Sequence, residues 1–257
     1  MGSFKRLEVR LAQDSDEVRQ AQALRYRVFY EELGARPTPA LRRLRRDVDA
    51  LVDRCDHLLV MDNTVDDAAR RVVGTYRLNM GGANAAAGIF YSADEYDLGP
   101  LLAREGRPLE VGRSCVAAEY RRGMVMQKLW TGISAYLEEQ DVSVMFGCAS
   151  FPGTDPRAHA RALSYLHHHH MAPAGLRTAA LPERRVDMAM LDVGSYDAEQ
   201  AQAELPPLIK GYMRLGGVIG DGAVIDCQFN TVDVCVVLNA REIVSRYQRY
   251  YDSRKAA

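Results

Sequence analysis

The sequence predicts an α/β fold built on a mixed β-sheet that helices flank. Short apolar segments with the two-residue period of strands are interspersed with longer segments that have the helical period. The run VSVMFGC at 142–148 is almost wholly apolar, as is typical of a strand covered on both faces. With 257 residues, the chain can bury a large core. We expect one domain over 1–257, with a C-terminal extension over 204–257 packed on it.

The N-terminal part is predicted as a strand followed by two helices. LEVRL at 7–11 alternates like a strand, Asp14 offers an N-cap, and the apolar stripe that follows stops at Gly34. The proline-started segment 36–54 keeps a helical stripe beside clustered arginines. We expect an amphipathic helix or mobile lid there, either simply solvated or attracted to acidic partners, which would be anionic lipids or an acidic carrier protein.

A hairpin comes next. HLLVM at 57–61 and VVGTYRL at 72–78 are predicted as antiparallel strands joined by an acidic turn. After a loop rich in glycine and alanine, a short strand is expected at 89–91 and one helical turn at 98–102.

The central stretch is LEVGRSCVAAEYRRG at 109–123. Its pattern predicts a strand, a basic turn and a helix that begins near Met124. Helix N-termini carry unpaired N–H groups and the positive end of the dipole, so Arg121, Arg122 and Gly123 indicate a site for a phosphate-bearing ligand.

Charged residues interrupt the central strand and the hairpin. Glu110 and Arg113 fall in the otherwise apolar central strand, and Arg77 falls in the second hairpin strand. Unpaired charge is costly in such places, so these side chains should be paired or used.

Further along, the strand at 142–148 ends in a loop that contains Ser150, a common location for ligand contacts. A helix is predicted from Asp155 into the four histidines at 167–170. Consecutive helical residues point in different directions, so we favour a native helix end over a zinc site.

The C-terminal part is predicted from its turn and apolar signals. It has a strand at 186–191, a helix starting at Pro206 and Pro207, a buried strand at 232–238 and a terminal helix. A polar group lies between two apolar elements, and its members either bond to one another or contact a polar ligand. It consists of Asp226, Asn230, Thr231 and Asp233.

Composition limits the partners. Lys and Arg number 33 against 34 Asp and Glu, so nothing indicates a nucleic-acid partner. The five cysteines form no CxxC pair, and we expect them to be reduced, buried and in a cytoplasmic protein. No apolar run is long enough to span a bilayer, so any membrane contact should be peripheral.

A set of residues, mostly charged and taken in chain order, resembles the signature of acyl-homoserine lactone synthases. They lie in the segments RYRVF, DRCD, VGTYRL and LEVGR and are Arg25, Phe29, Asp53, Asp56, Arg77, Glu110 and Arg113. The central stretch, ALSYLHHHHMAP and the block beginning LPPLIKGYMRLGG further resemble the bacterial ornithine N-alpha-acyltransferases, over about residues 25–247.

This resemblance implies an N-acetyltransferase-like (GNAT) fold and an enzyme that uses neither a metal nor a separate cofactor. It implies a 3-hydroxyacyl chain carried as a phosphopantetheine thioester on acyl carrier protein, L-ornithine as acceptor and lyso-ornithine lipid as product. The superfamily's coenzyme A loop is incomplete here, since Gly123 stands alone. A long-chain product implies peripheral contact with inner-membrane lipids.

The chemistry assigns roles as hypotheses. Amide formation needs a neutral amine, so a carboxylate must take a proton, and Glu110 is our candidate for the base or for orienting the amine. Arg113 and Arg77 hold the sheet geometry or the acceptor's carboxylate. Asp53 and Asp56 either bind the second amino group of ornithine or form structural ion pairs. The remaining candidate substrate contacts are Arg25, Phe29, Ser150, Asp226, Asn230 and Asp233.

Other functions stay open. The acceptor could be lysine, glutamine or glycine, or the enzyme could resemble a lactone synthase. The HxxxxD pattern of lysophospholipid acyltransferases occurs at His57 in HLLVMD, but its strand-to-turn context indicates a chance match. A non-enzymatic module that binds acyl carrier protein or membrane is the other alternative, although charges inside apolar strands argue against it.

Overall fold

The computed structural model describes residues 6–82, 86 and 89–245. The chain divides into two compact units. Unit 1 consists of Met1–Asn79 and Val111–Gln140, and unit 2 of Met80–Glu110 and Asp141–Ala257. Strand β5 (Arg107–Val116) therefore contributes its first four residues to unit 2 and the rest to unit 1.

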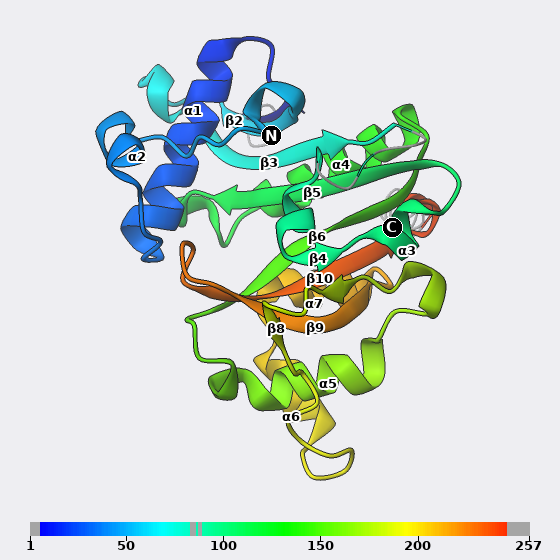
Figure 1. The fold of residues 1–257 in the computed structure, drawn as a ribbon. Helices are drawn as coiled ribbons and strands as arrows, with labels where there is room; N and C mark the ends of the chain where they lie inside the picture. The colour runs from blue at the N-terminus through cyan, green and yellow to red at the C-terminus, as the bar shows by residue number, and fades with distance from the viewer. Residues whose placement is uncertain (1–5, 83–85, 87–88, 246–257) are drawn as a thin grey trace, which may run out of the picture. The chain divides into compact units, whose positions relative to one another are not determined.

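Unit 1 is a sheet with a long helix packed on it (Figure 1). Its strands follow the order β1-β2-β3-β5, and β2 pairs antiparallel with both β1 and β3. Helix α4 packs on β1 and β2. The packing is close at Gly132, where an added Cβ would lie 2.7 Å from a Leu58 methyl. Besides β5, its elements are β1 (Leu7–Leu11), α1 (Ser15–Arg25), the π-helix η1 (Tyr26–Glu32), α2 (Pro39–Leu44), η2 (Val52–Arg54), β2 (Asp56–Asp62), η3 (Ala68–Arg70), β3 (Val72–Met80), η6 (Ala118–Tyr120) and α4 (Val125–Glu139).

Unit 2 is a mixed sheet with helices packed against it. Its strands follow the order β5-β6-β10-β9-β7-β4, with β8 pairing β9. The β5–β6 and β7–β9 pairs are parallel, whereas β10 is antiparallel to β6 and β9. The elements that complete it are η5 (Tyr91–Asp94), β4 (Tyr96–Asp97), α3 (Gly99–Leu102), β6 (Val142–Pro152), η7 (Pro156–His159), α5 (Ala160–His170), η8 (Ala174–Leu176), β7 (Ala179–Ala180), β8 (Arg185–Val186), α6 (Ala198–Glu204), α7 (Pro207–Arg214), β9 (Val218–Asp226) and β10 (Thr231–Asn239).

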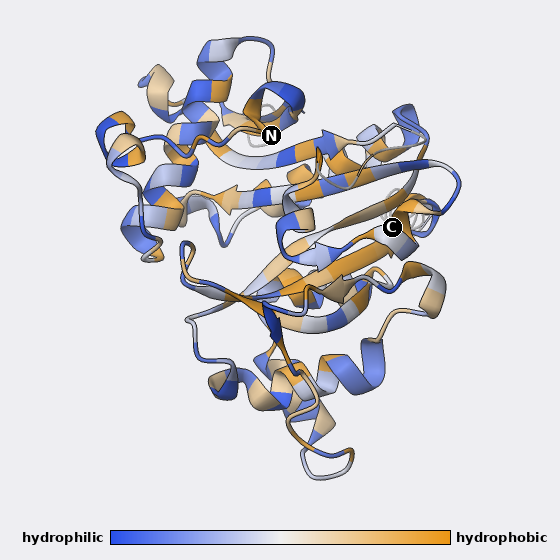
Figure 2. Ribbon diagram, viewed as in Figure 1, coloured by the Kyte–Doolittle hydropathy of each residue, from blue (hydrophilic) through white to orange (hydrophobic). Residues whose placement is uncertain are grey.

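The core of unit 2 lies under β6 and β10. Phe90, Tyr96, Phe146 and Val237 are all buried there. Strand β10 is strongly hydrophobic in Figure 2, whereas α5, which contacts β9 and α6, has both hydrophilic and hydrophobic residues. A strand inside the sheet layer is apolar because its side chains are buried, whereas a helix that packs on the sheet needs only one apolar face.

Most predicted elements are confirmed. Strands occur where the two-residue period indicated them, and the central strand, basic turn and helix α4 follow in the expected order. The four histidines do end α5, with His168 Nε2 2.9 Å from the carbonyl oxygen of Leu191. The terminal helix begins within 240–245, and its continuation lies outside the described residues.

Three expected elements are wrong. The segment 36–54 holds the six-residue α2 and the short η2 instead of one long helix, and α2 ends where Arg45 takes a left-handed backbone with φ 49°. Leu44, on its expected apolar stripe, is exposed. Residues 89–91 form no strand, and the strand expected at 186–191 shortens to β8. The helix α6, which the sequence analysis did not anticipate, follows it.

Two further outcomes concern single features. The first helical run stops just before Gly34 as expected, although α1 ends at Arg25 and the π-helix η1 continues the run to Glu32. All five cysteines have free thiols, but only Cys115 and Cys235 are buried, whereas Cys55 and Cys148 are half-buried and Cys227 is exposed. No helix in the described part of the chain combines the length and apolar composition that a bilayer crossing requires.

Candidate active site

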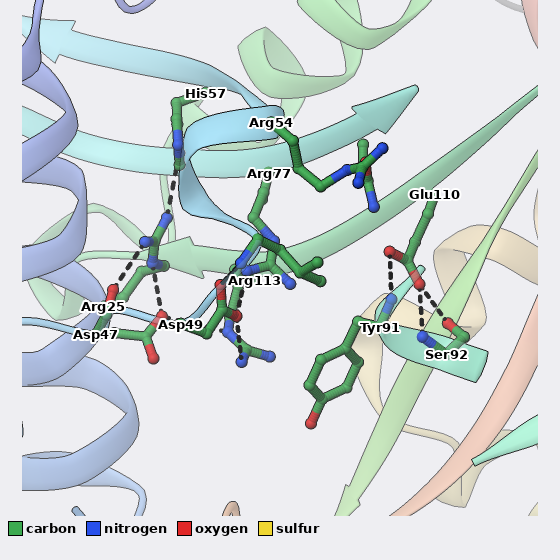
Figure 3. A network of polar contacts seen from close by, with 12 residues as sticks. Arg25, Asp47, Asp49, Arg54, His57, Arg77, Tyr91, Ser92, Glu110 and Arg113 are labelled. Atoms are coloured by element: carbon green, nitrogen blue, oxygen red, sulfur yellow. Dashed lines mark hydrogen bonds and ion pairs between the residues drawn. The ribbon is translucent and has the colours of Figure 1, made fainter. Parts of the chain in front are cut away.

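A buried ion-pair network lies in unit 1, centred on Arg25 (Figure 3). Arg25 is 1% exposed, and its Nε donates to Asp47 Oδ2 at 2.8 Å while Nη2 donates to the Asp47 carbonyl oxygen at 3.0 Å. Tyr30 donates its hydroxyl proton to the same carboxylate at 3.1 Å. Phe29, four residues after Arg25, is only half-buried.

The network continues into the central strand. Arg113 donates to Asp47 at 3.2 Å and to Asp49 at 3.3 Å, and Arg77 also pairs with Asp49. Burial disfavours the charge on Asp49, but Arg77 outweighs it and holds the pKa of this carboxyl below its usual value. The backbone of Arg113 is left-handed, with φ 53°, and the two carboxylates hold its side chain in place.

His57 borders this network on β2. Its ring Nδ1 lies 3.4 Å from Arg25 Nη1. Burial and the nearby Arg25 charge lower the pKa of His57 to about 4, so the imidazole is neutral at pH 7. This environment suits a structural histidine, in keeping with the chance HxxxxD match.

In unit 2, Glu110 holds a turn (Figure 3). Its carboxylate accepts hydrogen bonds from the Tyr91 and Ser92 backbone N–H groups at 3.0 and 2.7 Å and from the Ser92 hydroxyl at 2.7 Å. These bonds hold Tyr91 and Ser92 in the 3-10 turn η5, which begins at the last residue of the strand expected at 89–91. The sequence predicted that Glu110 would be paired or used, and its partners include the backbone N–H groups of Tyr91 and Ser92.

A cavity of about 370 Å³ lies at the end of this turn. Its wall consists of Tyr91, Asp94, Glu95, Arg184, Ile225, Asp226, Cys227 and Gln228. Tyr91 donates its hydroxyl proton to Asp226 Oδ2 at 3.2 Å, and Arg184 Nη2 lies 3.6 Å from Glu95 Oε1.

Glu95 is the unusual acid of this cavity. It is 2% exposed, and its Oε2 lies 3.2 Å from the Cys148 sulfur. Burial and the charge of Asp233 raise the pKa of Glu95 to about 7. Cys148 also lies 3.5 Å from Ser92 Oγ, which connects Glu95 to the turn that Glu110 holds.

The predicted C-terminal polar group is partly brought together here. Asp226 and Asp233 offer carboxylate oxygens within 4.8 Å of one of Glu95, a group that could hold a metal ion. Asp226 Oδ1 already accepts the backbone N–H groups of Gln228 and Phe229, and Arg184 already pairs with Glu95, so the donors fit a metal poorly. Ser150 pairs with Asp233 in the β6–β10 register.

Asn230 serves the chain turn rather than this cavity. Its backbone is left-handed with φ 57°, and its carbonyl oxygen accepts the N–H of Gly153 at 2.9 Å. Asparagine adopts this conformation more readily than most residues.

The basic turn precedes α4 as expected. Arg121 pairs with Glu32, whereas Arg122 and Gly123 are exposed. Helix α4 begins at Val125 without a side-chain cap from Met124.

The sequence analysis missed four residues of these two clusters. Asp47 and Asp49, not Asp53 and Asp56, pair with the arginines. Asp53 is exposed on η2, and Asp56 accepts the Tyr136 hydroxyl proton at 2.7 Å. Glu95 and Arg184 lie outside any strand or helix that sequence patterns mark, so only the fold reveals them.

Comparison with known proteins gives the family. An acetyltransferase (GNAT) domain model matches residues 24–131. An L-ornithine N(alpha)-acyltransferase from Agrobacterium fabrum is 47% identical over 254 residues, covering 97% of this chain and 86% of that protein. Another from Rhodobacter capsulatus is 40% identical over 248 residues, covering 96% and 95%.

The chain belongs to the L-ornithine N(alpha)-acyltransferase family. It is an acyltransferase with the GNAT-like mixed sheet and flanking helices that the sequence predicted. A solved structure of a CoA-dependent acyl-homoserine lactone synthase has the same fold, with a TM-score of 0.50 at 15% identity, over 92% of this chain and 82% of that chain.

Proposed function

We propose that this protein transfers a 3-hydroxyacyl chain from an acyl carrier protein thioester to the α-amino group of L-ornithine, giving lyso-ornithine lipid. Identity of 40–47% to L-ornithine N(alpha)-acyltransferases, over nearly the whole chain, is the observation that carries the proposal. Acyl transfer to another amino acid, such as lysine, glutamine or glycine, is the alternative that the test must separate.

The reaction is a direct transfer in a ternary complex. The neutral α-amine attacks the thioester carbon, the C–N bond forms, and the C–S bond breaks to release the pantetheine thiol. One proton leaves the ammonium before attack, and a second passes from nitrogen to the leaving sulfur. Glu110 is proposed to act on the amine, either as base or by orienting it through the turn that it holds.

The donor is proposed to place its phosphopantetheine phosphate at the start of α4. The uncapped N–H groups there and the exposed Arg122 beside them provide the positive potential that a phosphate needs. Arg122→Ala should therefore raise KM for acyl carrier protein without changing kcat, and Arg104→Ala, at an exposed site on unit 2, is the matched control.

Peripheral contact with anionic inner-membrane lipid is proposed for residues 36–46. Arg42 and Arg43 are exposed there beside the exposed Leu44, and Arg46 is half-buried. Co-sedimentation with vesicles that contain phosphatidylglycerol, and weak binding to pure phosphatidylcholine vesicles, is expected. Equal binding to both vesicles, or unchanged binding by the Arg42→Ala and Arg43→Ala double variant, would contradict it.

The central test is a mass-spectrometric assay with 3-hydroxyacyl carrier protein and an equimolar mixture of amino acids. The expected product is the ornithine amide. Acylation of another amino acid would keep the enzyme class but change the acceptor, and no amide with any amino acid would favour a binding module. Substituting 3-hydroxyacyl coenzyme A for the carrier thioester tests the donor, and Glu110→Gln with unchanged turnover would remove Glu110 from the mechanism.

A further inference from the structure

The cavity beside Glu95 has more acidic than basic residues in its wall. Asp94, Glu95 and Asp226 border it, and Arg184 is the one basic residue on its described wall. Asp233 lies behind, within the 4.8 Å group that Glu95 and Asp226 form. If all its lining acids were ionised, the cavity would have an excess of negative charge that a cation could neutralise.

The shape and donors favour an organic ammonium over a bare ion. A volume of about 370 Å³ is that of a small-molecule pocket. An ammonium offers three N–H donors and can bond to Glu95 and Asp226 together, whereas a metal ion would need to replace the backbone donors that already occupy Asp226 Oδ1. Arg184, at the cavity wall, pairs with Glu95 and donates to the Asp94 carbonyl oxygen, so a carboxylate of the same ligand would have to share this guanidinium.

We propose that this cavity receives the side-chain ammonium of the acceptor amino acid, and that Glu95 and Asp226 make the enzyme select a cationic amino acid over an uncharged one of equal length. The inference rests on the proposed function, because it assigns the acceptor's binding site. It also replaces Asp53 and Asp56 as partners of the second amino group, since neither borders this cavity.

Proton linkage follows from the environment of Glu95. Its pKa of about 7 means that a large share of Glu95 is protonated at neutral pH, and a bound ammonium would favour the carboxylate form. The groups that face it are Asp233 on β10, Asp226 on β9, Cys148 on β6 and Arg184. Ornithine binding should therefore release protons and tighten as the pH rises from 6 to 8.

The test compares ornithine with norvaline, which has the same carbon chain but no side-chain amine. The wild-type enzyme should favour ornithine in kcat/KM, and Glu95→Gln or Asp226→Asn should reduce that preference by roughly 10- to 100-fold. The loss should come from a higher KM for ornithine, with KM for norvaline unchanged. Glu105→Gln, an exposed acid outside the cavity, is the matched control and should keep the preference.

Different failures have different readings. Equal loss of activity on both amino acids in Glu95→Gln would make Glu95 structural, and an unchanged preference would place the ammonium elsewhere; either overturns the inference while the proposed function stands. If wild type acylates no ornithine, the proposed function fails, and calorimetric titration of ornithine into wild type and Glu95→Gln still decides whether the cavity binds it. Tight Ca²⁺ or Mg²⁺ binding that Glu95→Gln abolishes, without ornithine binding, would mean a metal site instead.

Discussion

Glu95→Gln should make the protein more stable at neutral and alkaline pH. Glu95 is buried, and its pKa rises from 4.5 to about 7 on folding, chiefly because of burial and then because of Asp233. The folded state therefore holds a proton that the unfolded chain has released between these two pH values. The stability that this proton contributes is complete below pH 4.5 and is lost as the pH rises through about 7.

The magnitude follows from the same pKa values. A difference of about 2.5 pH units corresponds to about 3 kcal/mol, at about 1.4 kcal/mol per unit. Glutamine cannot ionise, so the free energy of unfolding of Glu95→Gln should increase relative to wild type by up to about 3 kcal/mol between pH 5 and pH 8.5.

The assay is urea unfolding of wild type, Glu95→Gln and Glu105→Gln, followed by circular dichroism at half-unit steps from pH 5 to pH 8.5. Glu105 is exposed, so its variant should follow wild type at every pH. Parallel curves for Glu95→Gln and wild type would refute the reasoning, because they would mean that Glu95 titrates alike in the folded and unfolded chains.

Three further predictions concern unit 1. Arg25→Met should lower the free energy of unfolding by about 3–5 kcal/mol, because Asp47 would keep a buried charge without its main partner, and Arg25→Met with Asp47→Asn should recover part of the loss in the same denaturation assay. His57→Gln should make the stability of the protein less sensitive to acid. The neutral, buried imidazole contributes about 3 kcal/mol of stability that is complete above pH 6.5 and is lost as the pH falls through about 4. Thermal melts of the variant between pH 4 and pH 7 should not show this loss. Gly74→Ala should lower the free energy of unfolding by about 1–3 kcal/mol, because the new Cβ would lie 2.4 Å from Val125 Cγ1 at the start of α4. Gly82→Ala, with open space around it, should leave the melting temperature unchanged.

Local patterns accounted for most of the elements because they record which face of each segment is buried. The run at 142–148 and the alternation at 7–11 needed no tertiary information to predict β6 and β1. The same argument failed for residues 36–54, whose apolar stripe matches a long helix although α2 ends at Leu44, with Leu41 buried and Leu44 exposed.

For the charged residues, too, the sequence predicted one part and the fold decided the other. That Arg77, Glu110 and Arg113 must be paired or used followed from the cost of unpaired charge in an apolar strand. Which partners they found did not follow, because Asp47 and Asp49 are separated from Arg113 by more than sixty residues. Four aspartates between positions 47 and 56 offer no local signal for which of them turns inward.

The sequence by itself thus determined the fold class, the central strand, turn and helix, and the family that the comparisons established. Only the tertiary structure decided that Glu110 is bound by the turn at Tyr91 and Ser92 and that Glu95, Asp226 and Arg184 border one cavity. The physical reason is range: periodicity reports burial of neighbouring residues, whereas a site is made where strands distant in sequence pair and bring together side chains that no local pattern connects.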